Sequence, residues 1–354
     1  MAPALQAEFG FNQASAGLLT SAIFLTHALM QVPGGRLADK IGAARMMVLG
    51  LAWVAVGNFA IATSGSYWQL LFWKIFVGFG TGMSFTAGAR YIVRMFSGKE
   101  LHLAQGMFGG SIVMGSGFVI FAVPQILNSL GWRAAFLCSA TVAALVWLYW
   151  WIAIPKPKQG QKDSASIKQM AVHGELWLLG LLQMASFGLV LVVGTWITTL
   201  LKVDFKMGIR TAGVLGSLVL LLGIFTRPLG GWLIHRMRIS SLIRYALLLN
   251  AACCALLAWG QSLDFTIVAI LGLGLGCGLP YAAIFTRTAA LYPGRAGAAM
   301  GLVNMIGIVM ILVGAPAVGY LADFTGQFRS SFYALGAFSL IAAAATLALK
   351  DEVA

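Results

Sequence analysis

The chain has 354 residues, of which 60% are hydrophobic and 9% are charged. Soluble domains carry about 25% charged residues, so this composition excludes a soluble enzyme and predicts a membrane protein. The net charge of +13 would suit a nucleic-acid partner, but the placement of the cations, given below, accounts for that charge in another way.

Apolar runs of about 20 residues, the length that spans the hydrocarbon core of a bilayer, recur along the chain. They predict eleven membrane-spanning helices, near residues 13–34, 45–64, 68–93, 102–127, 132–154, 176–201, 208–233, 239–261, 264–290, 296–322 and 329–349. The sequence lacks the short alternating segments that would indicate a membrane β-barrel. The predicted fold class is therefore an all-α polytopic membrane protein.

The basic residues sort by side of the membrane. If the turn at 34–46 is cytoplasmic and the helices alternate in direction, sixteen Lys and Arg residues lie inside, five lie outside and two fall within helices. This positive-inside pattern explains the basicity without nucleic acid. It predicts a multi-pass protein of the cytoplasmic (inner) membrane, with the C-terminus in the cytoplasm. Trp73, Trp132, Trp177 and Trp196 lie near helix ends, where an aromatic belt is expected.

No pattern in the sequence indicates a chemical reaction. The four cysteines lie within predicted helices and have no metal-ligand spacing with the four histidines, so we interpret them as small apolar residues. There is no Ser/His/Asp set on loops and no cofactor motif. We therefore expect neither an enzyme nor a bound cofactor or metal.

An internal repeat relates the two halves of the chain. The segment GGRLADK (34–40) aligns with GGWLIHR (230–236) at an offset of 196, and the glycines of VGFGTGM (77–83) align with those of LGLGCGL (273–279) at the same offset. Such a repeat predicts two parallel bundles. The predicted domains are 1–154 and 176–354, joined by a polar cytoplasmic linker at 155–175.

The same offset places the counterpart of the helix at 176–201 before the first residue of the chain. We therefore expect the N-terminal bundle to hold helices two to six of a six-helix unit, with helix one missing. A truncation, a misassigned start and a genuine eleven-helix protein all remain open.

The turn Gly-Arg-Leu-Ala-Asp-Lys-Ile-Gly at 35–42 resembles the signature loop of the major facilitator superfamily. The resemblance covers essentially the whole chain and implies two six-helix bundles around a central path, which rock to expose that path to either side. It also implies that charges in this turn and its weaker copy act as a lock between two conformations. The gating residues predicted in this way are Gly35, Arg36, Asp39, Lys40, Gly42, Arg45, Gly231, His235 and Arg236.

Ionisable residues at membrane depth are candidates for function because they are costly there. No carboxylate of the sequence falls at mid-membrane, which disfavours a proton-coupled exporter that needs one. Lys74 and Arg227 fall within predicted helices, with His27 as a switchable companion, and this excess of cations favours an anionic substrate.

The segment IFTRPLGGW around Arg227 is also similar to the eighth helix of the nitrate/nitrite porter branch. In that branch an Arg of this helix faces an Arg of the second helix across the substrate. The offset puts the neutral Gln31 at the second position, so half of the expected charge is missing. The substrate-binding residues predicted from charge, resemblance and position are Arg227, Lys74, Gln31, His27, Gln105 and Asn304.

The sequence thus predicts a secondary active transporter that moves a small anionic solute by alternating access. The expected partners are that solute, the lipid bilayer and a coupling ion, either a proton or a counter-anion. Two alternatives stay open, a proton-coupled drug or metabolite exporter and a non-transporting membrane sensor or scaffold.

Overall fold

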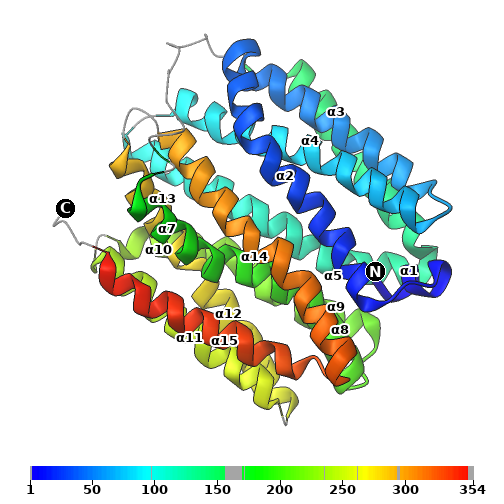
Figure 1. The fold of residues 1–354 in the computed structure, drawn as a ribbon. Coiled ribbons are helices and arrows are strands. Elements are labelled where there is room, and N and C mark those ends of the chain that lie inside the picture. Colours follow the sequence, from blue (N-terminus) through cyan, green and yellow to red (C-terminus); the bar gives the residue numbers. More distant parts are fainter. Residues whose placement is uncertain are drawn as a thin grey trace. The chain divides into compact units, whose positions relative to one another are not determined.

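The computed structural model describes residues 2–96, 98–155, 170, 172–234, 236–260, 262–292 and 296–349. Helices make up almost all of these ranges (Figure 1), and no strand occurs among the residues described. The contacts divide the chain into two units. The first holds Met1–Gln105 with Gln125–Ala165, and the second holds Gly106–Pro124 with Ser166–Ala354.

The first unit is built from four helices and the second half of a fifth. Their bounds are α1 Ala2–Phe9, α2 Gln13–Ile41, α3 Ala43–Ala62, α4 Tyr67–Met95 and α5 Gly98–Ile152. Polar caps begin two of the long helices, because the side chains of Asn12 and Ser66 accept hydrogen bonds from the backbone N–H groups of Ser15 and Gln69. Helix α4 packs against both α2 and α3.

The turn between α2 and α3 is much shorter than the 34–46 segment predicted from the sequence. Helix α2 continues through the charged motif to Ile41, and the chain turns at Gly42 alone, whose φ is +94°. That conformation suits glycine and strains other residues. Arg45 follows on the exposed face of α3.

Helix α5 joins two spans that the sequence predicts as separate. It runs for 55 residues and is interrupted by one non-helical residue, Gly131, whose φ is +77°. The expected loop between 127 and 132 is therefore a kink. Residues 106–124 of this helix contact the second unit's helices, whereas its later part belongs to the first unit.

The second unit contains the remaining helices. Their bounds are α7 Gly174–Gln183, the π-helix η1 Met184–Gly188, α8 Leu189–Asp204, α9 Ile209–Leu221, α10 Gly223–Leu233, α11 Ile239–Trp259, α12 Leu263–Gly278, α13 Pro280–Leu291, α14 Ala296–Thr325, α15 Arg329–Ala345 and the short 3₁₀ helix η3 Thr346–Ala348. Three predicted spans are thus each divided in the middle, at η1, at Leu222 and at Leu279.

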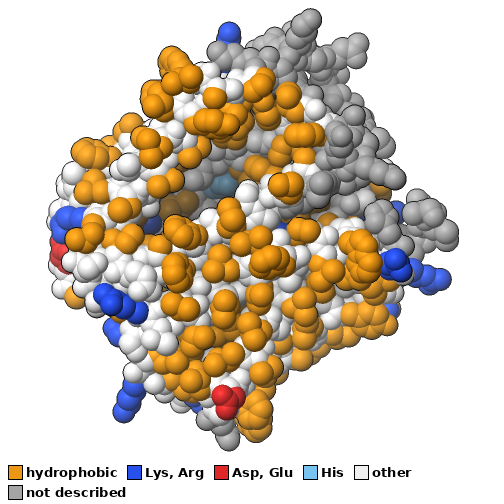
Figure 2. All heavy atoms as spheres, turned by 180° about the vertical axis from the view of Figure 1, so that it is seen from behind, with side chains coloured by type: hydrophobic (Ala, Val, Ile, Leu, Met, Phe, Trp, Pro, Cys, Tyr) orange, Lys and Arg blue, Asp and Glu red, His pale blue; other side chains and the backbone are white. Residues whose placement is uncertain are grey.

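Nine helical stretches within the described residues are long and apolar enough to cross a membrane. One of them, residues 107–152, contains two predicted spans across the Gly131 kink, and α2 is not among the nine. Large apolar side chains such as Phe225 and Ile152 are more than 70% exposed, and Figure 2 shows hydrophobic side chains spread over the face in view. Such a surface suits lipid.

Two of the four tryptophans expected in an aromatic belt are instead buried. Trp132 lies inside the first unit, where its Nε1–H donates to the carboxylate of Glu8. Trp196 lies inside the second unit and donates to the carbonyl oxygen of Ala315 at 3.0 Å. The belt prediction was wrong for both, because each indole N–H has a partner within the protein.

The internal repeat reappears in the packing of the glycine ladders. A Cβ added at Gly80 would lie 2.9 Å from the carbonyl oxygen of Gly50, and one added at Gly276 would lie 2.9 Å from that of Ala246. Both residues of the second contact follow those of the first by 196 positions. In both units these glycines therefore let neighbouring helices pack closely.

An ion pair is duplicated in the same way. Glu8 pairs with Arg133 at 2.8 Å, and Asp204 pairs with Arg329 at 2.9 Å. Both partners of the second pair again follow those of the first by 196 positions. We call these two contacts the repeat ion pairs, and each one ties the two ends of its own unit together.

Candidate functional site

Arg227 is the most deeply buried charged side chain that the structure describes within a membrane-spanning helix. It lies on α10, and only 1% of its surface is exposed. Small residues hold α10 close to its neighbours, since a Cβ added at Gly230 would overlap the backbone of Leu279. The hydroxyl of the preceding Thr226 donates to the carbonyl oxygen of Gly274 at 3.2 Å. This packing fixes where the guanidinium lies.

Three helices other than α10 supply the immediate neighbours of the guanidinium. Its Nη1 donates to the carbonyl oxygen of Gly109 on α5. Its Cζ lies 4.0 Å from the ring centroid of Tyr281 on α13 and 5.7 Å from that of Phe187 in η1. Ring faces attract a cation, and more strongly when the pair is away from water. Backbone and aromatic groups therefore surround this charge.

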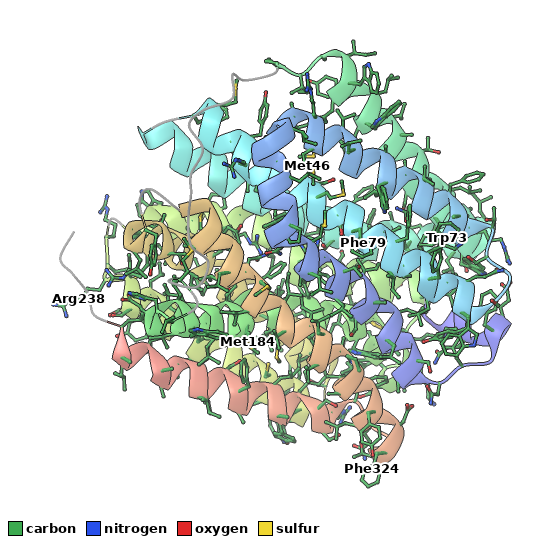
Figure 3. All side chains as sticks on the ribbon, turned by 45° about the horizontal axis from the view of Figure 1, so that its top comes forward. Met46, Trp73, Phe79, Met184, Arg238 and Phe324 are labelled. Carbon is green, nitrogen blue, oxygen red and sulfur yellow. The ribbon has the colours of Figure 1, made fainter. Side chains whose placement is uncertain are left out.

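The π-helix η1 contributes to the site through its irregular backbone. Single π-turns inside α-helices are frequent at functional sites, and this one carries Phe187. Ser186 in the same turn donates to the carbonyl oxygen of Cys277 at 2.7 Å. Figure 3 labels Met184, the first residue of the turn, among the helices of the second unit.

A small cavity adjoins the guanidinium. Its volume is about 10 Å³, and it is lined mainly by apolar groups from α5, α8, α9 and α12, with Arg227 as the charged residue in its wall. This volume holds at most one water molecule. The structure therefore leaves little space beside the guanidinium.

The charge of Arg227 is not compensated by an acid. Within the described residues no carboxylate pairs with it, and its Nε has no hydrogen-bonding partner. A buried cation without a counter-ion costs several kcal/mol, about 3–5 when its partner is removed. The arrangement is thus chemically suited to receive an anion, because a guanidinium binds planar oxyanions through two parallel hydrogen bonds.

In the first unit, the structure brings His27 and Gln31 to one face of α2. They are four residues apart, which is about one helical turn. Gln31 is 3% exposed, and neither polar atom of its side chain has a partner among the described residues. The packing supports its equivalence to Arg227, because Met30 contacts Gly82 just as Thr226 contacts Gly278.

The other predicted substrate residues are placed apart from these. Lys74 lies two turns into α4, half-buried, with its Nζ 4.8 Å from the ring centroid of Phe136. Asn304 is buried on α14 and is not among the neighbours of Arg227. The side chain of Gln105 lies outside the described residues.

Of the predicted gating residues, several also fall outside the described part of the chain. This holds for the burial of Gly35, for the side chains of Arg36, Asp39 and Lys40, and for the whole of His235. Arg236 is exposed, with its Cζ 5.1 Å from the ring centroid of Trp232. The charge lock stays a prediction.

The sequence did not single out two of the three neighbours of Arg227. Gly109 and Phe187 carry no charge, and their role depends on contacts between helices far apart in the chain. Tyr281 had a signal, since a tyrosine in an apolar helix needs a polar or charged neighbour when buried. The sequence also did not predict the hydrogen bond between His27 and Thr81.

Comparison with known proteins identifies the family. The family model described as "Major Facilitator Superfamily" matches residues 1–307 and 244–354, and so spans the whole chain. A crystal structure of a bacterial homologue of the human lysosomal transporter Spinster, in an inward-facing and occupied conformation, has the same fold. The two share a TM-score of 0.75 and 17% sequence identity, over 98% of this chain and 91% of that one.

Curated relatives cover nearly the full chain at low identity. A probable nitrate/nitrite antiporter of Thermus thermophilus is 23% identical over 94% of this chain and 82% of its own length. A probable sulfoacetate transporter of Cupriavidus necator is 25% identical over 98% of this chain and 87% of its own length. Together with the all-helical fold and the family match, these relatives establish that the chain belongs to the Major Facilitator Superfamily and is a multi-pass membrane transporter, not an enzyme.

Proposed function

We propose that this transporter moves a small anionic solute across the cytoplasmic membrane by alternating access, with Arg227 as the residue that binds the anion. The observation that carries the proposal is the buried guanidinium without a carboxylate partner among the described residues. An anion entering this site would gain two hydrogen bonds and would neutralise the charge. A cationic solute would meet repulsion at the same place.

The relatives support an anion. The Thermus protein is named for nitrate and nitrite, and the Cupriavidus protein for sulfoacetate. Nitrate is a planar oxyanion, and sulfoacetate carries two acidic groups with oxyanion oxygens. The planar guanidinium can bind two oxygens of either solute through its parallel N–H groups. Within this proposal Lys74, Gln31, Gln105 and Asn304 are the further residues that line or attract the substrate.

Alternating access requires a lock that forms in one conformation and breaks in the other. We assign that role to the charged turn at 35–42, with Arg45, and to its counterpart Gly231, His235 and Arg236. The linker at 155–175 and the C-terminus would then lie in the cytoplasm, on the side where most cations gather.

The test is ligand-induced stabilisation of the purified protein. We expect nitrate, nitrite or sulfoacetate to stabilise the folded protein by mass action and so to raise its melting temperature. At a concentration 100 times Kd, the free energy of unfolding increases by about 2.7 kcal/mol. In Arg227→Gln this rise is lost, and in Arg227→Lys it is reduced, because an ammonium keeps the charge and loses the fork.

Arg238→Gln is the matched control, since Arg238 is exposed and projects outward before α11 (Figure 3). That variant should respond to anions as the wild type does. Stabilisation by cationic drugs with no anion effect, unchanged in Arg227→Gln, would reject the proposal.

A further inference from the structure

The hydrogen bonds around His27 define which of its ring nitrogens carries a proton. Its Nδ1 lies 3.1 Å from Oγ1 of Thr81 on α4, and the Thr81 hydroxyl donates to the carbonyl oxygen of Gly78 at 3.0 Å. A hydroxyl has one proton to donate. Both bonds form together only when Nδ1 donates to Thr81, which is the Nδ1–H tautomer of the neutral ring.

The second nitrogen, Nε2, is then the basic one. It has no hydrogen-bonding partner among the residues that the structure describes. The rings of Phe24 and Phe85 flank the imidazole, with centroid distances of 6.3 and 5.6 Å. A proton can therefore be added to Nε2 or removed from it while the bond to Thr81 and the position of the ring stay the same.

Among the described residues of the surrounding helices, no acidic side chain bonds to this nitrogen. Helix α2 contacts α1, α3 and α4. The described charged side chains on these three helices are Glu8, which pairs with Arg133, the exposed Arg45, Lys74 beside Phe136, and Arg90. Lys74 and Arg90 are seven and nine residues from Thr81, or about 10 and 13 Å along the helix axis.

The other ionisable residues of α2 are Arg36, Asp39 and Lys40. They follow His27 by nine or more residues in the sequence, and their side chains lie outside the described part of the chain. Of the tyrosines on α4, Tyr67 donates to the carbonyl oxygen of Ser15 at 3.2 Å, and Tyr91 donates to that of Pro155 at 3.1 Å. Proton binding at His27 changes the charge of its imidazole from zero to +1.

The position of His27 in the repeat relates its protonation to the anion site. One turn further along α2 lies Gln31, the counterpart of Arg227, with a buried amide that has no partner among the described residues. The second unit therefore carries a permanent cation at this level of its repeat. The first unit carries a neutral amide and, one turn before it, a group that becomes a cation by taking up a proton.

We propose that His27 binds the coupling proton, so that one proton accompanies each singly charged anion. This rests on the proposed function, since it names the ion that moves with the substrate of that transporter. The lone pair of Nε2 takes the proton on one side of the membrane, giving imidazolium with two N–H groups. Release on the other side restores the neutral ring, and the cycle moves no net charge.

This coupling has a fixed thermodynamic signature. For electroneutral one-to-one symport, a gradient of one pH unit supports about tenfold accumulation of the anion, because each pH unit is worth about 1.4 kcal/mol. A variant without a titrating nitrogen at position 27 equilibrates the anion and cannot accumulate it.

The experiment uses the full chain in proteoliposomes, with labelled nitrate as the probe for exchange and accumulation and labelled sulfoacetate as a second probe for exchange alone. Exchange of labelled for unlabelled anion at equal pH measures transport alone. Accumulation with the outside about one pH unit more acidic measures coupling. The variant is His27→Asn, whose amide N–H can still donate to Thr81. The matched control is His173→Gln, at a histidine of the second unit.

We expect wild type and His173→Gln to exchange and to accumulate about tenfold, and His27→Asn to exchange without accumulating. Should His27→Asn fail to exchange at all, His27→Gln takes its place. Thr81→Val provides an independent readout, because it keeps the imidazole and removes its Nδ1 acceptor. In that variant we expect accumulation to persist with a shifted pH profile.

The failures are distinguishable. Accumulation by His27→Asn equal to that of wild type overturns the role of His27. Wild type that exchanges an anion without accumulating it overturns proton coupling and leaves the anion transporter intact. Absence of anion exchange in wild type with both probes overturns the proposed function, and with it the coupling.

Discussion

Glu8 shows how a single residue is tuned by its neighbours. Its carboxylate accepts hydrogen bonds from Arg133 and Trp132, and these two donors hold the pKa of Glu8 below its ordinary value of 4.5. Because the folded state has the lower pKa, the stabilisation is fully present above the unfolded value. It is lost as the pH falls through the folded value.

A pH series on Glu8→Gln checks this sign. We expect the variant to melt below wild type at neutral pH, because it removes the charge-assisted bonds. The difference between the two melting temperatures should shrink as the pH falls below 4.5, since wild type then also loses its charged carboxylate. A difference that stays constant down to the most acidic pH tested would contradict the assignment. Because the other carboxylates are present in both proteins, their effect on the melting temperature cancels in this difference.

At the scale of one element, α5 explains why glycine is needed at particular turns of a helix. Gly109 belongs to the second unit, and a Cβ there would overlap the ring of Tyr281. Its carbonyl oxygen is also the acceptor for Arg227. Gly115, six residues on in the same helix, is exposed, and a Cβ there would meet no atom within 4 Å.

These two positions form a matched pair of substitutions. Gly109→Ala should lower the melting temperature and weaken anion binding, because overpacking costs about 1–3 kcal/mol and moves Tyr281 away from Arg227. Gly115→Ala should leave anion binding unchanged and the fold as stable or slightly more so, by up to about 1 kcal/mol. Thermal melting with and without nitrate measures both effects, and equal behaviour of the two variants would argue against the described contact.

Helices could be predicted from the sequence, and their interruptions largely could not. An apolar run shows that a segment crosses the membrane, because lipid demands that its backbone be hydrogen-bonded internally. Nothing in such a run marks where one turn widens into a π-helix, as at Met184–Gly188, or where α9 gives way to α10 at Leu222. Gly42 was predictable because glycine has a backbone preference of its own.

Some residues of the site could likewise be predicted from the sequence, and others could not. Arg227, His27 and Gln31 could be found because charge and polarity are conspicuous in an apolar helix, and because the repeat relates two of them. The contacts of Gly109, Phe187 and Thr81 depend on tertiary packing, which brings together residues 118 positions apart in the case of Gly109 and Arg227. No local pattern encodes that pairing.

For the whole molecule, the duplication gives each unit an ion pair of its own. The repeat ion pairs lie in different units and share no partner. Free-energy changes at sites without shared partners add within about 0.3–0.5 kcal/mol.

Arg133→Gln and Arg329→Gln therefore should each reduce stability, and the double variant should lose the sum of the two. Arg329 should have the larger effect, because its side chain is 32% exposed against 46% for Arg133, and exposed pairs contribute less. Reversible unfolding in detergent measures all three free energies. A double variant that loses clearly more or less than the sum would show that the pairs are coupled.

The equivalence of Gln31 and Arg227 also bears on how such a protein can change over generations. Each codon for glutamine becomes an arginine codon when its middle adenine is replaced by guanine. A single nucleotide substitution at position 31 thus gives the first unit the residue that its duplicate already has. One point mutation would thus give both units an arginine at equivalent positions of the repeat and change the charge selectivity of the transporter. Laboratory selection for transport of doubly charged anions would be the natural way to find that mutation.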